Sequence, residues 1–294
     1  MLRIIRLRKI WFIFSGLLVA ISLLAFLVWG LKLGTDFTGG SILEYEYQNS
    51  RPDMEKIRQE ITVAGFENFT LQPFGEKAFL LKSAEMSEIN HQKLLQVFGG
   101  QGEEKRFESI GPTIGQELRK TTFSAILIVT VFILLYVSWA FRKVTSYGKV
   151  NAWTYGLATL VALFHDIIIL TGAFVFFGHF WNVEIDTSFV AALLTTLGYS
   201  VNDTIVVFDR IRENLLKNSA GESFAKIAEK SVNETLARSF STSFTAILTL
   251  VAIFLFGGSS IRYFVLALIV GIATGTYSSI FLASPILVWW EKRR

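Results

Sequence analysis

The stretch Ile10–Leu31, IWFIFSGLLVAISLLAFLVWGL, decides the fold class of this chain. It contains no charged side chain, and about 20 apolar residues are enough to cross a bilayer as a helix. A helix buried in a soluble domain would be shorter or would carry a polar stripe. Five more long apolar runs follow: Phe123–Phe141, Ala152–Trp181, Ser188–Phe208, Phe240–Phe256 and Tyr263–Trp290. The sequence therefore predicts a polytopic α-helical membrane protein with six transmembrane helices.

Basic residues in the short connecting segments predict the orientation of these helices. Asn182–Thr187 has no Lys or Arg and Gly257–Arg262 has one. The segments on the other side are rich in them: Arg3, Arg6, Arg8, Lys9; Arg142, Lys143, Lys149; Arg210, Arg212, Lys217, Lys226, Lys230; and Lys292, Arg293, Arg294. Since cytoplasmic loops carry the excess of positive charge, both termini are expected in the cytoplasm. The formal net charge of +4 then reflects topology and not a nucleic-acid partner.

Between the first two spans the composition changes. Residues 32–118 hold no long apolar run, and acidic residues outnumber basic ones, 14 to nine. We therefore expect three parts: residues 1–31 with the first span, an extracytoplasmic domain at 32–118, and spans two to six in residues 119–294. The acidic excess argues against nucleic-acid binding here as well.

The order of elements in residues 32–118 can be predicted. Strands are expected at Ser41–Tyr47, Phe69–Phe74, Ala78–Lys82 and Lys105–Ile110, from alternation and turn signals. Helices are expected from Pro52 to Gly65 and over Ser87–Phe98. The resulting βαββαβ order indicates a small α+β domain of the ferredoxin-like type. His91, between Asn90 and Gln92, is predicted to be a solvated surface residue and not a metal ligand.

Two glycine-rich junctions flank this domain, at Gly34–Gly40 and Ile110–Gly115. They are typical of simple turns, in which glycine supplies a positive φ and proline fixes an entry angle. The alternative is a pair of hinges that let the domain move against the membrane. The hinge candidates are Gly34, Gly39, Gly40, Gly111, Pro112 and Gly115.

Asp203 and Arg238 stand out because ionisable groups at membrane depth are costly. Asp203 lies about 9–10 Å inside the charged end of the fourth span, at 1.5 Å per helical residue. Asp is too short to reach water from that depth, whereas Arg238, at the start of the fifth span, is as well explained by snorkelling. If a conformational change alternately pairs and separates the two, Asp203 would bind and release a proton in each cycle.

Other polar groups in the spans are His165, Asp166 and Asn202. His165 and Asp166 could extend such a relay, but a polar contact between helices is equally compatible with the pattern. Adjacent helical residues point about 100° apart, so the two are not expected to face one spot. Gly271 and Gly275, in a small-xxx-small pattern, more simply predict close helix packing.

No sequence pattern indicates catalysis. We find no nucleotide-binding motif, metal-ligand cluster or nucleophile–base pair, and the chain has no cysteine. We therefore expect no enzyme activity, no metal and no cofactor other than protons.

At this point the motifs resemble those of the SecF family of bacterial protein-export subunits. The resemblance covers nearly the whole chain and is carried, in order, by Gly34–Gly40 (GTDFTGG), Ile110–Leu118 (IGPTIGQEL), Ala162–Asp166 (ALFHD), Gly198–Glu213 (GYSVNDTIVVFDRIRE) and Ala237–Ser239 (ARS).

The resemblance implies a subunit that pairs with SecD in the bacterial cell (inner) membrane and belongs to the resistance–nodulation–division superfamily. It implies use of the proton-motive force to help an unfolded preprotein leave the SecYEG channel, with Asp203 and Arg238 in the family's proton-conducting positions. Membrane lipid is the remaining expected partner. Two alternatives stay open: a passive scaffold for SecD and the channel, and a small-molecule exporter of the same superfamily. The single six-helix half and the short exported segment disfavour the exporter.

Overall fold

The structure is a computed structural model that describes residues 2–142, 151–217 and 221–291. It divides into two compact units, one formed by Met1–Lys32 with Ser124–Arg294 and the other by Leu33–Phe123. The five basic residues Lys143, Lys149, Lys292, Arg293 and Arg294, used above for orientation, lie outside the described residues.

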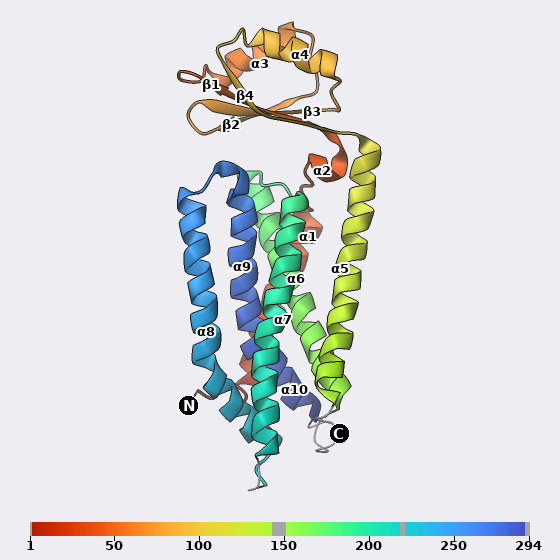
Figure 1. Ribbon diagram of the computed structural model, residues 1–294, viewed down its shortest axis with the longest axis vertical. Coiled ribbons are helices and arrows are strands. Elements are labelled where there is room, and N and C mark those ends of the chain that lie inside the picture. The colour runs from red at the N-terminus through yellow and green to blue at the C-terminus, as the bar shows by residue number, and fades with distance from the viewer. Residues whose placement is uncertain (1, 143–150, 218–220, 292–294) are drawn as a thin grey trace. The chain divides into compact units, whose positions relative to one another are not determined.

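Helices make up the first unit, which we call the membrane unit (Figure 1). Within the described ranges, six helical stretches are long and apolar enough to cross a membrane. They are α1 (Arg8–Trp29), α5 (Pro112–Ala140), α6 (Ala152–Trp181), α7 (Thr187–Leu216), α8 (Phe224–Phe256) and the continuous run α9 (Arg262–Ser278), η3 (Ser279–Ala283) and α10 (Ser284–Glu291). A 3-10 turn, η2 (Ser259–Ile261), precedes α9. Each predicted span is helical over nearly all of its length, as expected for a multi-pass membrane protein.

Small residues let α9 approach α7 closely. A Cβ atom on Gly271 would lie 2.4 Å from Cγ2 of Thr196, and one on Gly275 would lie 2.7 Å from Cβ of Ser200. Neither distance is tolerable, so only glycine fits at these two positions. The predicted packing role of Gly271 and Gly275 is confirmed, and α9 contacts α6, α7 and α8 at the centre of the unit.

The helices α7 and α8 continue well beyond the predicted spans at Ser188–Phe208 and Phe240–Phe256. The early part of α8 buries one face, which includes Ile227, Ser231 and Thr235 at helical spacing. This amphipathic extension packs against the end of α7, so the helical hairpin is longer than its apolar part.

The second unit contains a four-stranded antiparallel sheet and two helices. The strands are β1 (Gly40–Tyr47), β2 (Thr70–Phe74), β3 (Ala78–Ser83) and β4 (Gly102–Ile110), in the spatial order β2-β3-β1-β4. The helices are α3 (Met54–Val63) and α4 (Glu88–Val97), with a short α2 (Thr35–Thr38) before β1. Both α3 and α4 lie on one face of the sheet (Figure 1).

Strand β1 shows why the sheet has one covered and one open face. Its alternate residues Leu43, Tyr45 and Tyr47 are buried in the core with the helices, while Glu44 and Glu46 are turned to the other face. On the open face Glu44 lies opposite Arg106 of β4. Burial is the main cause that raises the pKa of Glu44, and the Arg106 guanidinium opposes it.

The prediction for His91 was wrong. Its side chain is 5% exposed, and its ring stacks on Phe107 of β4 with the ring centroids 3.6 Å apart. Nε2 lies 2.9 Å from Glu104 and Nδ1 lies 3.4 Å from Glu88. The polar neighbours Asn90 and Gln92 gave no sign of this burial, because Phe107, which covers the His91 ring, comes from strand β4.

Candidate functional site

Asp203 lies on the inward face of α7 and is 7% exposed. The hydroxyls of Ser239 from α8 and Ser279 from η3 lie beside its carboxyl group. They are not aligned for regular hydrogen bonds to both oxygens. Within the described part of the chain, Oδ2 of Asp203 and Oγ of Ser239 are both buried without a hydrogen-bond partner. Asp203 is therefore an acid that the chain encloses but does not fully satisfy.

The structure does not bring Arg238 onto Asp203. The residue that faces Asp203 from α8 is Ser239, and Arg238 is exposed on a different side of that helix. No ion pair to Arg238 is formed by any residue that the structure describes. The two predicted partners are thus near each other along the helix pair but are not paired in this chain alone.

Asp166, which we considered as a possible extension of the relay, is the centre of a hydrogen-bond cluster. Oδ2 accepts from Ser200 Oγ of α7 at 2.6 Å and from Ser278 Oγ of α9 at 2.8 Å. Oδ1 lies 3.0 Å from Nδ1 of His165. The side chain is 5% exposed, so this carboxyl joins α6, α7 and α9 inside the unit.

The π-helical segment η3 allows two adjacent serines to contact different helices. Ser278 bonds to Asp166 on α6, and Ser279 Oγ lies 2.8 Å from Oγ1 of Thr204 on α7. Ser284 Oγ donates to the Ser279 carbonyl at 3.1 Å, which satisfies a carbonyl group in the widened turn. π-Helical turns of this kind often occur at functional sites. From the sequence, Ser278 and Ser279 are expected to assist the close helix packing of Gly271 and Gly275, and the π-helical turn itself is not predicted.

Apart from its Nδ1 contact with Asp166, the His165 ring faces Tyr277 and a cavity. It stacks on Tyr277 with ring centroids 5.9 Å apart, and it lines a cavity of about 580 Å³ between α1, α6 and α10. Its Nε2 is buried and has no hydrogen-bond partner among residues 2–142, 151–217 and 221–291. Asp166 and His165 therefore contact each other through Oδ1 and Nδ1, while the rest of each side chain has different surroundings.

Asn202 is exposed on α7 and shares an outward face with Ala191, Thr195 and Gly198. On α8 a second set of exposed polar residues recurs at helical spacing: Arg238, Ser241, Thr242 and Thr245. We use the name outward polar face for the polar members of these two sets, which are Thr195, Asn202, Arg238, Ser241, Thr242 and Thr245. Polar side chains on the outside of membrane-spanning helices are costly unless a partner or a water-filled space covers them.

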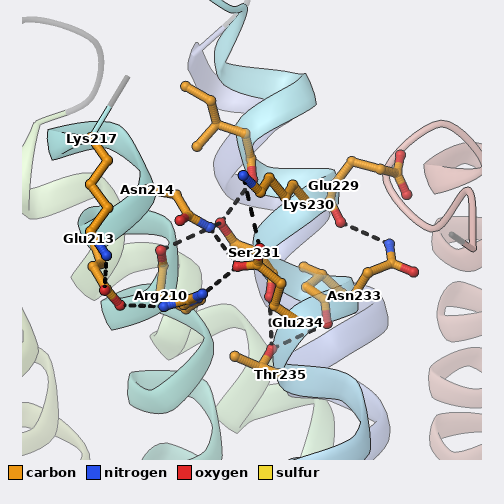
Figure 2. Close-up of polar contacts among 12 residues, drawn as sticks. Arg210, Glu213, Asn214, Lys217, Glu229, Lys230, Ser231, Asn233, Glu234 and Thr235 are labelled. Atoms are coloured by element: carbon orange, nitrogen blue, oxygen red, sulfur yellow. Dashed lines mark hydrogen bonds and ion pairs between the residues drawn. The ribbon is translucent and has the colours of Figure 1, made fainter. Parts of the chain in front are cut away.

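A cluster of charged residues joins the end of α7 to the early part of α8. Figure 2 shows Arg210 of this cluster between two glutamates. Its Nε donates to Glu234 at 2.6 Å and its Nη1 donates to Glu213 at 2.6 Å. Asn214 Nδ2 donates to Ser231 Oγ at 2.9 Å and to Glu234 at 2.8 Å. Arg210, taken above only as a topology signal, also holds the helical hairpin together.

The same end of α8 anchors the start of the chain. The Glu229 carboxylate accepts from the backbone N–H groups of Ile5 and Arg6, both at 3.1 Å. Asn233 accepts from the N–H of Leu2 at 2.7 Å. The N-terminal segment and the α7–α8 connection therefore lie at the same end of the bundle, which is the arrangement that the basic residues predict.

The two glycine junctions pack against each other inside the second unit. A Cβ on Gly39 would lie 2.9 Å from Cα of Pro112, and one on Gly115 would lie 3.0 Å from the Gly39 nitrogen. Gly40, at φ +133°, would place a Cβ 2.6 Å from the Ser83 carbonyl oxygen. Gly34 precedes α2, and Gly111 faces the Glu85 carboxylate. The hinge role of these residues stays a prediction.

Comparison with known proteins decides the family. Residues 90–293 match the family model described as protein export membrane protein SecD/SecF, C-terminal. The chain is 39% identical over 308 residues to the protein translocase subunit SecF of Thermobaculum terrenum, covering 100% of this chain and 95% of that protein. For SecF of Vibrio alginolyticus the identity is 39% over 287 residues, covering 95% and 86%.

The chain belongs to the SecF family.

SecF relatives are named as protein translocase subunits, and membership gives this chain a role in Sec protein export. The model described as the SecD/SecF GG motif matches residues 25–50, which include the first glycine junction. In that junction the close approach of Gly39 to Pro112 gives a physical reason for glycine.

Solved SecDF structures share the fold. The crystal structure of SecDF from Thermus, described as a translocon-associated membrane protein, superposes with a TM-score of 0.83 and 34% identity. It covers 99% of this chain and 38% of the SecDF chain. SecDF in its super-membrane-facing form gives a TM-score of 0.69 at 33% identity, with 99% and 39% covered. The chain thus corresponds to little more than a third of a SecDF polypeptide.

Proposed function

We propose that this SecF-family chain acts with SecD to use the proton-motive force in late steps of preprotein translocation through SecYEG. It does so in the bacterial cell (inner) membrane with both termini in the cytoplasm and residues 32–118 on the far side. Names of the relatives support the export role, and the match to SecDF supports SecD as the partner. Membrane lipid and the unfolded preprotein are the other contacts of this proposal.

Asp203 is the proton-binding group of the proposed mechanism. The observation that carries this assignment is its burial with Oδ2 left without a partner, beside the equally unpartnered Ser239 hydroxyl, in the part of the chain that the structure describes. A carboxylate in apolar surroundings with incomplete hydrogen bonding is costly, whereas its neutral form is not. Proton uptake removes that cost, and an approaching cation restores the charged form.

Arg238 is the cation of this mechanism, and SecD completes the site. Asn202 and Arg238 both belong to the outward polar face, which flanks the buried Asp203. SecD covering that face would remove Arg238 from lipid and direct its guanidinium towards α7. Arg238 would then displace the proton from Asp203 when the two helices approach.

The driving force is sufficient for a mechanical step. One charge that crosses 100 mV is worth about 2.3 kcal/mol. Since about 1.4 kcal/mol is a factor of ten, one proton can bias a two-state equilibrium by roughly fifty-fold. The proposed output is movement of the exported domain, with the glycine junctions as hinges, which keeps an emerging polypeptide from sliding back.

The open face of the exported sheet is the surface proposed for the preprotein. The domain is ferredoxin-like in this proposal, since the βαββαβ order and the strand order β2-β3-β1-β4 agree with that arrangement. Glu44, Glu46 and Arg106 lie on strands that supply the open face. A charged, solvated sheet suits transient, sequence-tolerant contacts better than tight binding. No catalytic step is part of this function.

Substitution Asp203→Asn tests the proposal, with Asp209→Asn as the matched control. Asp209 is on the same helix but is exposed and paired with Arg212 at 2.7 Å. Both variants are produced with SecD, assembly is checked by copurification, and export of a preprotein is followed with and without a proton gradient. We expect Asp203→Asn to assemble and to lose gradient-dependent export, and Asp209→Asn to keep it. Wild-type export by Asp203→Asn would favour the passive scaffold instead.

A further inference from the structure

Asp166 is anchored to α7, which carries Asp203, and to Ser278 at the end of α9, the residue directly before Ser279, which lies beside the Asp203 carboxyl. We propose that Asp166 is a positioning residue: its carboxylate holds α6, α7 and the end of α9 in the arrangement that keeps the space beside Asp203 closed. The inference rests on the proposed function, because it assigns Asp166 a part in the Asp203 site.

The contacts between the two acids are continuous. Ser200, which donates to Asp166, lies one helical turn before Thr204, and Thr204 Oγ1 donates to the Ser200 carbonyl at 3.0 Å. Ser279 Oγ contacts both Thr204 Oγ1 at 2.8 Å and the Ser200 carbonyl at 3.2 Å. Ser279 also lies beside the Asp203 carboxyl. A chain of direct contacts therefore connects Asp166, through Ser200 and Ser279, to the Asp203 carboxyl.

Both serine hydroxyls converge on one oxygen of Asp166, and this favours the ionised form as the holding state. An ionised carboxylate only accepts hydrogen bonds, and bonds to it are roughly twice as strong as neutral ones. A neutral side chain of the same shape would keep the geometry but hold α7 and α9 less firmly. The packing of Gly275 against Ser200, where a Cβ would come within 2.7 Å, leaves no room for compensation by a shift of α9 towards α7.

Substitution Asp166→Asn separates charge from shape. The amide oxygen that the substitution introduces can still accept from the two serines, and the new NH₂ group can donate to His165 Nδ1, since a histidine ring nitrogen takes either role. The variant is therefore expected to fold. Ser278→Ala is the second variant, because it removes one donor and leaves Asp166 in place.

Access to the Asp203 site can be measured by cysteine labelling, since the natural chain has no cysteine. Ser239→Cys places a thiol beside Asp203, and Ser138→Cys places a control thiol in the buried contact of α5 with Gly156 of α6. Each is labelled with a membrane-permeant maleimide in vesicles that carry the full chain with SecD. A general loss of structure would expose both thiols, whereas a positioning role of Asp166 affects only the one at position 239.

The expected result is slow labelling of both thiols with Asp166 present, and labelling at position 239 faster by about tenfold in Asp166→Asn and in Ser278→Ala. Labelling at position 138 stays slow. Unchanged protection at position 239 in both variants, or equal acceleration at both positions, overturns the inference. Labelling does not depend on proton transport. If Asp203→Asn retains gradient-dependent export, the proposed function fails, and the labelling pattern still decides whether Asp166 closes the site.

Discussion

Asp166 and Asp203 are two acids buried in the same helix bundle, and their surroundings differ. Asp166 receives two serine hydroxyls on one oxygen and faces His165 with the other. Asp203 has an oxygen without a partner in the described residues, beside the unpartnered hydroxyl of Ser239. The difference teaches that burial alone does not mark a working acid. In the proposed mechanism, the satisfied carboxylate organises the helices and the unsatisfied one exchanges its proton.

The contact of α9 with α7 supports the surroundings of both Asp166 and Asp203. A substitution that breaks this contact should therefore have the largest effect on stability and export. In Gly275→Leu the side chain would clash with Ser200, because even a Cβ at position 275 would lie only 2.7 Å from the Ser200 Cβ, and overpacking of this kind costs about 3 kcal/mol. We expect a lower thermal unfolding temperature and loss of export. Gly198→Leu is the control for the unfolding temperature of the purified chain, because nothing lies within 4 Å of a Cβ there. Equal stability of the two variants would contradict the packing account.

The two acids should differ in what they contribute to stability. Asp166→Asn removes charge-assisted hydrogen bonds and should lower the unfolding free energy by about 1.5–3 kcal/mol. Asp203→Asn removes a buried carboxylate that is incompletely hydrogen-bonded, so the unfolding free energy should stay the same or rise. Denaturation of the purified chain in detergent compares them directly. The distinction between the acids is lost if Asp203→Asn is the more destabilising variant.

Much of this contrast lies beyond sequence reasoning. The apolar runs predict the spans because a bilayer imposes a length and a composition on each helix. The charged parts of α7 and α8 beyond the apolar runs cannot be predicted in this way, because they are stabilised by ion pairs such as Arg210 with Glu234. The partners of Asp166 are 34 and 112 residues away along the chain, so only the folded bundle reveals that its charge is satisfied.

In the second unit, too, the sequence predicted some features and missed others. Alternation in β1 and the turn residues predicted the strands, because side chains on a half-buried strand alternate between two environments. His91 was misread, since its local sequence is polar and its partner Phe107 belongs to a strand that follows the helix. Asp203 could be found because aspartate is short and rare at such depth, whereas Ser239 and Ser279 carry no comparable signal.

His91 of the second unit is, like Asp166, a buried polar group that has hydrogen-bond partners. His91→Ala removes the stack on Phe107 and the contact with Glu104, and should destabilise the second unit by about 1–2 kcal/mol. Pulse proteolysis of the intact protein in urea would measure it, since the cleaved fragment reports the unit that opened. Gln92→Ala, at an exposed neighbouring position, should leave the midpoint unchanged. A smaller shift for His91→Ala than for Gln92→Ala would contradict this interpretation.

Tyr47 is, like Asp203, a buried group with an atom that lacks a hydrogen-bond partner in the described residues, and its substitution should have the smallest effect on stability. Its hydroxyl is buried with no hydrogen-bond partner in the described chain, so Tyr47→Phe should stabilise the second unit by about 0.5–1 kcal/mol at neutral pH.

Its pH dependence has a defined sign. Burial, with smaller contributions from Glu60 and Tyr45, raises the pKa of Tyr47 to about 12 from the ordinary value of 10.0. The unfolded tyrosine ionises first, so stability present below pH 10 is lost as the pH rises towards 12, by at most about 1.4 kcal/mol per pH unit. Pulse proteolysis at alkaline pH should show that the stability of Tyr47→Phe falls less steeply with rising pH than that of the wild type. An identical slope in wild type and variant would show that Tyr47 does not titrate as described.

Proton flux is the most direct test of Asp203 as the working acid. The chain is reconstituted with SecD in liposomes, a proton gradient is imposed, and internal pH is followed by a trapped dye for wild type, Asp203→Asn and Asp209→Asn. The account predicts that flux is retained in wild type and in Asp209→Asn and is lost in Asp203→Asn, although that variant assembles normally. Wild-type flux through Asp203→Asn would contradict it.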